Sequence, residues 1–226
     1  DDKVLEAANY YDDNKIIKIP IDNTKTPAEN AQKYFDKYGK MKRTAEALNE
    51  LIIETKGQID HLESIQNSLD IALSADDLVQ IKDELIEYGF IKKGKNAKKQ
   101  KVKSKPFHYV SSDGFDIYVG KNNYQNDELT FKLATGNDWW FHAKGMPGSH
   151  VIVKAENKEL PDRTFEEAGK LAGYYSKGKN ADKVEIDYLQ KKNVKKPNGA
   201  AAGFVVYYTN YSLTIHPDIS DIRQIE

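Results

Sequence analysis

The residues of this chain that are best suited to chemistry lie in the segment DWWFHAK, residues 138–144. Successive side chains of a β-strand point to opposite faces of the sheet, so a strand here would place Trp140, His142 and Lys144 on one face and residues 139, 141 and 143 on the other. An aromatic ring beside a histidine and a lysine can stack on an unpaired base and pair with its phosphate. Core packing is the alternative for either aromatic set, and the pattern leaves open which tryptophan is exposed.

A second motif, PGSH at residues 147–150, predicts a tight turn before a strand. His150, His142 and Asp138 together suggest a metal site or an acid–base pair, as in a metal-dependent hydrolase. The spacing provides no third patterned ligand, and the chain has no Cys. Ser149 lacks the GxSxG surroundings of a nucleophile elbow. We therefore expect no catalytic residue, no metal and no cofactor.

Two further segments carry groups that suit a phosphate. Residues 120–126, GKNNYQN, combine a glycine and a lysine with four side-chain amides, which either cap the next helix or contact bases and phosphates. Residues 191–199, KKNVKKPNG, form a basic loop without an acidic residue, which is either a solvated loop or a phosphate site. The candidate RNA-contacting residues are Lys121, Asn122, Asn123, Asp138, Trp139, Trp140, His142, Lys144, Ser149, His150, Lys191, Lys192, Lys195 and Lys196.

Charge is distributed unevenly along the 226 residues, although the formal net charge is only −1. Residues 1–91 have 11 basic and 19 acidic residues, whereas residues 92–105 have eight lysines and no acidic residue. Such a basic block is either a solvated tether or an arm that contacts phosphates. The pattern indicates local contact with a polyanion. No apolar run approaches the ~18 residues of a membrane span, so we expect no membrane partner.

Residues 106–226 predict a compact α+β domain with a mixed or antiparallel sheet. The turn SSDG at residues 111–114 lies between two short apolar runs and predicts a hairpin of residues 107–110 with 115–119. A capping box at Thr164 predicts the start of a helix. We expect further strands at residues 139–143, 151–153, 184–189, 203–208 and 212–216, and helices at residues 126–134 and 164–176.

Residues 26–91 predict a long helical arm. The segment TPAE, residues 26–29, has a capping residue, a proline at the first helical position and a glutamate that completes a capping box. From Ala31 to Leu62, apolar residues recur at alternating steps of three and four, which is the heptad pattern of a coiled coil. The seam needs a partner helix, which lies either in sequence outside this chain or in a second copy.

The arm is expected to consist of one helix over residues 27–73, with a break near Gly39 as the alternative. Ser74 and Asp77 predict the start of a shorter helix, which Gly89 ends.

Residues 1–25 resemble the end of an upstream domain. The β-branched residues 16–21 predict one strand, which cannot be stable alone, so its partners are expected upstream of this chain. Four segments are therefore expected. They are the end of an upstream domain (1–25), a coiled-coil arm (26–91), a basic linker (92–105) and the α+β domain (106–226).

The motifs of the last segment resemble the RNA-binding NFACT-R domain of the NFACT family. The segments at residues 120–126, 138–144, 147–151 and 194–200 (VKKPNGA) occur in the order of that family. Upstream, NYYD (9–12) and TPAENAQKYF (26–35) resemble the stretch that enters the family's coiled coil. The resemblance covers nearly the whole chain and fits the bacterial RqcH type. One departure is AAAG at residues 200–203, where the family pattern suggests a further basic residue or proline. This departure argues against a phosphate contact at the end of the loop, but not at Lys195 and Lys196.

The resemblance implies a factor of ribosome-associated quality control that supports the rescue of stalled ribosomes. Such a factor binds a large (50S) ribosomal subunit obstructed by peptidyl-tRNA, holds a tRNA, expected to be alanyl-tRNA, and supports C-terminal alanine tailing. The ribosome performs peptide transfer, so we do not expect an enzyme. The α+β domain is expected to face RNA and the acidic coiled coil to contact ribosomal proteins, in the cytoplasm.

A surface adhesin that binds fibronectin is the competing interpretation, because some members of this family are known as fibronectin-binding proteins. The chain has no recognisable anchor, wall-sorting motif or repeat, which argues mildly against it.

Overall fold

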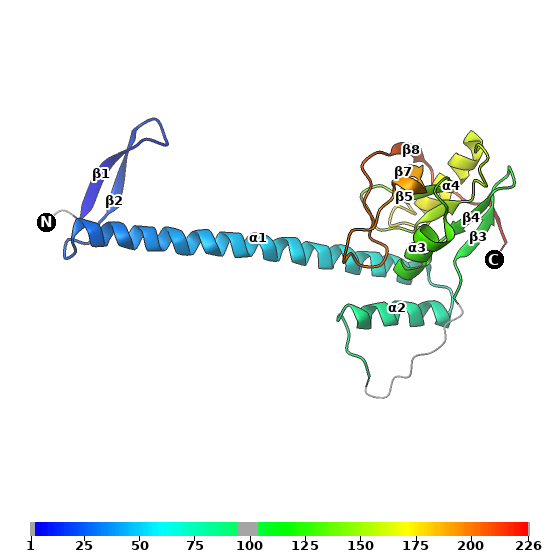
Figure 1. The fold of residues 1–226 in the computed structure, drawn as a ribbon, viewed down its shortest axis with the longest axis horizontal. Helices are drawn as coiled ribbons and strands as arrows, with labels where there is room; N and C mark the ends of the chain where they lie inside the picture. The colour runs from blue at the N-terminus through cyan, green and yellow to red at the C-terminus, as the bar shows by residue number, and fades with distance from the viewer. Residues whose placement is uncertain (1–2, 95–103, 226) are drawn as a thin grey trace. The chain divides into compact units, whose positions relative to one another are not determined.

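The computed structural model describes residues 3–94 and 104–225, which divide into two units (Figure 1). The first unit ends at Gly57 and the second begins at Gln58, so the helix α1 (Pro27–Ile71) contributes to both. Most of the expected basic linker, residues 92–105, lies outside the described residues. Among the described residues, no helix is long and apolar enough to cross a membrane.

The first unit opens with an antiparallel hairpin of β1 (Val4–Asn9) and β2 (Lys15–Pro20). The expectation that this strand finds its partner upstream is therefore wrong, because β1 pairs with it through a tight turn. Asn30 of α1 accepts a hydrogen bond from the backbone N–H of Asp22 at 2.7 Å and donates one to its carbonyl at 2.9 Å. These two bonds fix the end of the hairpin against the start of α1.

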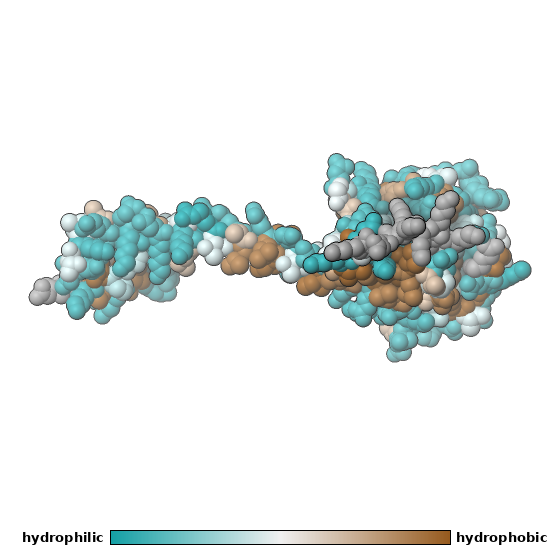
Figure 2. Space-filling view, turned by 90° about the horizontal axis from the view of Figure 1, so that it is seen from below, coloured by the Kyte–Doolittle hydropathy of each residue, from teal (hydrophilic) through white to brown (hydrophobic). Residues whose placement is uncertain are grey.

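The helix α1 begins with the expected capping box and continues without a break. The Thr26 hydroxyl accepts a hydrogen bond from the Glu29 backbone at 3.3 Å, and the Glu29 carboxylate accepts one from the Thr26 backbone at 2.8 Å. Both Gly39 and Gly57 lie inside the helix, so the expected alternative of a break is wrong. A brown patch on this helix in Figure 2 corresponds to exposed apolar residues of the seam region. No second helix covers them within residues 3–57, and the coiled coil remains a prediction.

The second unit is built on a seven-stranded sheet in the order β8-β7-β5-β6-β4-β3-β9, with every neighbouring pair antiparallel. The expected hairpin and four of the five further strands are present. Residues 203–208 are the exception, because they form only an isolated bridge between Val206 and Lys195. The strands are β3 (Phe107–Val110), β4 (Asp116–Val119), β5 (Trp139–Ala143), β6 (Val151–Val153), β7 (Val184–Gln190), β8 (Tyr211–Ile215) and β9 (Arg223–Gln224).

Both faces of this sheet are covered. On one face, Phe141 and Ala143 belong to a large hydrophobic cluster to which α4 (Asp162–Tyr174) contributes. On the other face, Trp140 and Ile152 pack with residues of η1 (Leu129–Leu133) and with Val194. The alternation expected for the strand is therefore confirmed, and both of its faces are packed.

The remaining helices follow local signals to different degrees. The predicted start of α2 (Ala75–Glu87) is confirmed, because Ser74 and Asp77 form a capping box, and Gly89 has the positive φ typical of a helix C-terminus. The expected capping box at Thr164 is wrong: α4 starts two residues earlier, and the Thr164 hydroxyl donates to Asp113 instead. The expected helix 126–134 is found as α3 (Asn123–Glu128) followed by the π-helical turn η1.

Candidate nucleic-acid site

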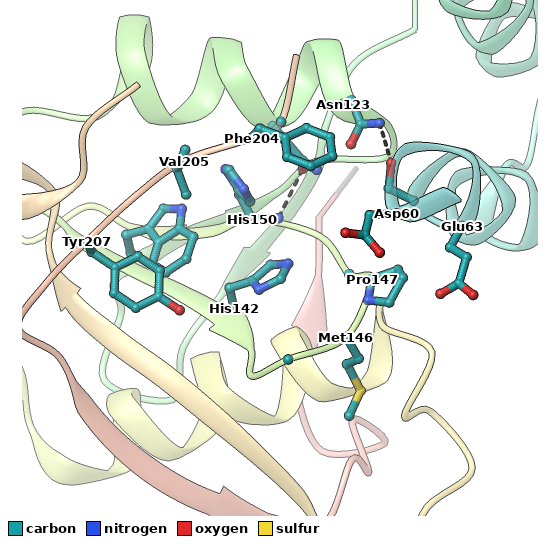
Figure 3. Close-up of a pocket in the computed structure, with 16 residues that line it drawn as sticks. Asp60, Glu63, Asn123, His142, Met146, Pro147, His150, Phe204, Val205 and Tyr207 are labelled. Carbon is teal, nitrogen blue, oxygen red and sulfur yellow. Dashed lines mark hydrogen bonds between the residues drawn. The ribbon is translucent and has the colours of Figure 1, made fainter. Parts of the chain in front are cut away.

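A pocket of about 420 Å³ lies within the second unit, between the end of α1, α3, β5 and the segment 203–207 (Figure 3). Its size is in the range of small-ligand sites. Figure 3 shows the histidines on one side of this space and the α1 carboxylates on the opposite side. The residues that line it are Asp60, Glu63, Ser64, Asn123, Asn126, Trp140, His142, Gly145, Met146, Pro147, Gly148, His150, Gly203, Phe204, Val205 and Tyr207.

Two neutral histidines form the centre of the pocket wall. The rings of His142 and His150 meet edge to face, with centroids 5.6 Å apart, and His142 stacks on Trp140 at an interplanar angle of 18°. Burial lowers the pKa of His142 to about 4. Burial, followed by the proximity of His142, also holds the pKa of His150 well below its usual value. Both rings are therefore uncharged near pH 7 and each offers one donor and one acceptor nitrogen.

Hydrogen bonds from neighbouring elements fix His150. Its backbone N–H donates to Asn126 Oδ1 at 3.0 Å, and its Nδ1 lies 2.8 Å from the Thr130 hydroxyl. Asn126 in turn packs against Gly120, where any Cβ would overlap the amide. The glycine and the last asparagine of the segment 120–126 thus hold the His150 backbone in place.

The segment 203–207 closes the pocket without forming a strand. Gly203 has a φ of +79°, and a Cβ there would lie 2.5 Å from Asn123 Oδ1, so both the conformation and the space require glycine. The half-buried rings of Phe204 and Tyr207 face the pocket, and the Tyr207 hydroxyl donates to Asp187 at 2.9 Å. These rings provide apolar walls for a flat ligand.

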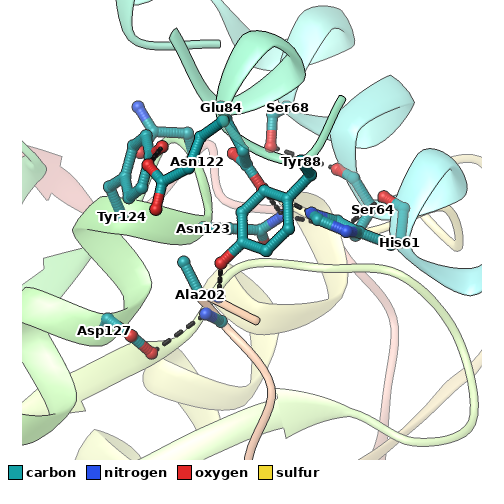
Figure 4. A network of polar contacts seen from close by, with 12 residues as sticks. His61, Ser64, Ser68, Glu84, Tyr88, Asn122, Asn123, Tyr124, Asp127 and Ala202 are labelled. Atoms are coloured by element: carbon teal, nitrogen blue, oxygen red, sulfur yellow. Dashed lines mark hydrogen bonds and ion pairs between the residues drawn. The ribbon is translucent and has the colours of Figure 1, made fainter. Parts of the chain in front are cut away.

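A buried polar network behind the pocket connects α1, α2 and α3 (Figure 4). Glu84 Oε1 lies 2.8 Å from His61 Nε2 and accepts a hydrogen bond from Asn123 Nδ2 at 2.8 Å. Asn123 also donates to the Ser64 hydroxyl at 2.8 Å. Burial raises the pKa of the fully buried Glu84, against the effects of Asn123 and His61. The network positions Asn123 at the pocket.

Four of the fourteen candidate residues meet in this pocket, namely Asn123, Trp140, His142 and His150. The sequence left open which tryptophan is exposed; the side chain of Trp140 is 0% exposed and packs between the sheet and η1. It is the floor of the pocket. Trp139 lies on the opposite face of the sheet, where its ring meets Phe165 edge to face at 4.8 Å.

Other candidate residues are used inside the fold. Asn122 is the N-cap of α3, and buried Asp138 accepts backbone hydrogen bonds from Thr135 and Ala155 and pairs with Lys154. Lys121 lies 3.5 Å from Asp77, and Lys144 pairs with Glu185. Ser149 is buried, and its hydroxyl has no hydrogen-bond partner among the residues that the structure describes. None of these five candidates lines the pocket.

The basic loop separates into engaged and available lysines. Lys196 pairs with Asp127, and Lys191 Nζ lies 5.6 Å from the centroid of the Phe131 ring. Lys192 and Lys195 are exposed, and neither has a salt-bridge partner in the described part of the chain. These two are the cations of the loop that remain available to a phosphate.

Several pocket residues had not been selected from the sequence. Asn126 lies inside the amide-rich segment that was singled out, and Phe204 and Tyr207 belong to an aromatic run that was interpreted as a strand. Asp60 and Glu63 gave no signal, because a carboxylate on a heptad helix is indistinguishable from a solvated one. Within residues 3–94 and 104–225, no group of three or more metal-ligating side chains is present.

The comparisons with known proteins define the class. The profile for the NFACT N-terminal and middle domains matches residues 1–104, and the profile for the NFACT protein RNA-binding domain matches residues 105–208. The chain belongs to the NFACT family.

Its relatives include the Rqc2 homolog RqcH of Streptococcus pneumoniae serotype 2 (strain D39), with 42% identity over 219 residues, which is 96% of this chain and 39% of that protein. RqcH of Bacillus subtilis (strain 168) is 38% identical over the whole chain and 40% of its own length. A solved structure, the C-terminal part of the fibronectin/fibrinogen-binding protein from Streptococcus suis, matches with a TM-score of 0.79 and 41% identity, over 88% of this chain and 80% of that one. The chain thus spans about two fifths of the curated relatives.

Proposed function

We propose that this chain is the RNA-binding part of a ribosome-associated quality-control factor. The observation that carries the proposal is the match of residues 105–208 to the RNA-binding domain of NFACT proteins, since that range contains most of the pocket and the basic loop. The relatives named RqcH support the same function.

The chemistry of the second unit is consistent with single-stranded RNA. Unpaired bases bind in apolar, aromatic-lined sites, whereas lysines contact the backbone. The pocket supplies the half-buried Phe204 and Tyr207 and two neutral histidines, and Lys192 and Lys195 supply exposed positive charge. RNA binding is therefore expected to weaken as the salt concentration rises, with a shallow slope because the chain contacts few phosphates.

The finer proposal follows the family resemblance. The factor binds an obstructed 50S subunit with peptidyl-tRNA, holds a tRNA, and supports C-terminal alanine tailing while the ribosome performs peptide transfer; the chain itself is not an enzyme. The acidic α1 suits basic ribosomal proteins better than RNA. Such a function places the protein in the cytoplasm.

Fluorescence anisotropy of labelled tRNA, titrated with the chain at several salt concentrations, tests the proposal. We expect micromolar or tighter binding whose logarithm falls linearly with the logarithm of the salt concentration. The variant Lys192→Ala/Lys195→Ala should bind more weakly, whereas Lys82→Ala, an exposed lysine on α2, is the matched control. No binding of tRNA or of isolated 50S subunits at low salt would contradict the proposal.

A second candidate function is fibronectin binding, which the name of the Streptococcus suis structure favours. Capture of the chain by immobilised fibronectin at physiological salt, unchanged by nuclease treatment, would support it. Capture that disappears on nuclease treatment would indicate that RNA bridges the two proteins.

A further inference from the structure

The pocket has an unusual charge for a site in an RNA-binding domain. Its lining contains two carboxylates, Asp60 and Glu63, and no lysine or arginine. The histidines are neutral because burial lowers their pKa values. Glu63 lies 3.3 Å from Lys177, so its charge is partly compensated, whereas exposed Asp60 has no salt-bridge partner among the described residues. A phosphate group would be repelled from this side of the pocket.

The inner side of the pocket offers an unused hydrogen-bond donor. Trp140 Nε1–H is buried and has no partner in the described structure. Asn126, whose carbonyl oxygen accepts from the His150 backbone, also lines the pocket. A buried unpaired donor costs about 1–3 kcal/mol, so it indicates a missing acceptor. Nucleobases present ring nitrogens and carbonyl oxygens of this kind.

We propose that the pocket binds the 3′-terminal nucleoside of an RNA strand, with its base inside and its free ribose hydroxyls towards Asp60. The inference rests on the proposed RNA binding. An internal nucleotide has a phosphate on both sides of its ribose, whereas a 3′-terminal nucleoside has a phosphate only on its 5′ side. Hydroxyl groups can donate to the Asp60 carboxylate, as ribose hydroxyls do to acidic residues in dinucleotide sites.

The walls and volume of the pocket agree with this occupant. Phe204 and Tyr207 are half-buried and provide faces for stacking, and Trp140 and the histidines complete an aromatic floor. A volume of about 420 Å³ suits one nucleoside and excludes a helical stem. The exposed Lys192 and Lys195 belong to the same unit, outside the pocket lining, where they are available to the phosphates that precede the terminal nucleoside.

The test compares two single-stranded RNAs of one sequence, ending in a 3′-hydroxyl or a 3′-phosphate, by anisotropy with the whole chain. We expect the 3′-hydroxyl RNA to bind about tenfold more tightly, since a phosphate near Asp60 is repelled. Asp60→Asn should remove this preference, mainly by improving binding of the 3′-phosphate RNA. Asp70→Asn, the same change elsewhere on α1, should leave the preference intact. In NMR spectra, the Trp140 indole N–H should shift on binding of the 3′-hydroxyl RNA only.

Equal affinity for both RNAs, with no effect of Asp60→Asn, would overturn the terminal-nucleoside site and leave RNA binding through the lysines standing. Competition by a lysine-containing peptide that is lost in Asp60→Asn would also overturn it, because the pocket would then be a cation site. Absence of binding to either RNA and to tRNA at low salt would instead refute the proposed function itself.

Discussion

Replacing Glu84 with alanine is expected to destabilise the second unit strongly. Glu84 is 0% exposed, and its Oε1 is the acceptor for Asn123 Nδ2 and the partner of His61 Nε2, both at 2.8 Å. The substitution leaves these two groups buried without their acceptor and creates a cavity between α1, α2 and α3. The same change releases Asn123 from its position at the pocket.

The magnitude follows from the partners that remain. Each buried polar group that loses its partner costs about 1–3 kcal/mol, and the cavity left by a large buried side chain adds to this cost. Asn123 keeps its hydrogen bond to Ser64, so the cost of leaving Asn123 without Glu84 lies at the lower end of the range of about 1–3 kcal/mol. We expect a decrease of roughly 3–5 kcal/mol in the free energy of unfolding, or about 6–20 °C in Tm, at ~2–4 °C per kcal/mol.

Urea unfolding followed by tryptophan fluorescence measures this decrease in the second unit alone. The chain has two tryptophans, Trp139 and Trp140, and both lie in that unit. Glu87→Ala is the matched control, because Glu87 is an exposed glutamate of α2 that bonds only the Tyr124 hydroxyl. The control should cost at most about 1 kcal/mol. A loss of less than about 1 kcal/mol in Glu84→Ala would refute the reasoning, because the network would then not support the unit.

Three further outcomes are expected. Burial lowers the pKa of His142 to about 4, so as the pH falls the unfolded chain takes up a proton on this residue before the folded chain does. The free energy of unfolding should therefore be at its full value above pH ~6.5 and decrease towards pH 4. His142→Gln should make this decrease smaller, as measured by tryptophan-monitored unfolding. Lys192→Ala/Lys195→Ala should reduce the salt slope of tRNA binding by ~1–2, whereas Lys144→Ala, which removes a lysine paired with Glu185, should change it less. Asn30→Ala should cost about 1–3 kcal/mol in the first unit, seen as faster amide exchange in β2 with unchanged tryptophan unfolding.

Local patterns in the sequence predicted most elements of the fold. The strands at residues 139–143 and 151–153 were predicted to the residue, because runs of apolar and β-branched residues between turns allow few alternatives. The capping box at Thr26 and the helix start at Ser74 were predicted for the same reason, since the groups that bond are three residues apart. The capping box predicted at Thr164 failed because its hydroxyl bonds Asp113, 51 positions away. Signals of this range hold where no distant residue competes for the same hydrogen-bonding groups.

Predictions failed where distant residues determine the conformation. Residues 203–208 have the aromatic and β-branched composition of a strand, but Gly203 must adopt a positive φ beside Asn123, 80 positions earlier in the sequence. The alternation in residues 139–143 correctly separated the two faces of β5. It could not indicate that η1 and Val194 cover the second face, and so the exposure of Trp140 stayed open. A period of two identifies the faces of a strand and not what packs on them.

Contacts between residues that are distant in the sequence also explain why the positions of lysines in the sequence were a poor guide to the candidate site. Lysines are available to RNA only if no carboxylate reaches them, and the carboxylates that pair with Lys196 and Lys144 are 69 and 41 positions away. Conversely, the lining of the pocket has two carboxylates and no lysine or arginine, so the basic segments of the sequence did not indicate it. Its elements are glycines that permit close approach, amides that fix the backbone, and histidines whose burial keeps them neutral. The inner part of the pocket, which consists of such neutral groups, suits a base, which is the part of RNA that carries sequence information. The phosphate contacts and the base contact of this domain are therefore expected to be separable by mutation.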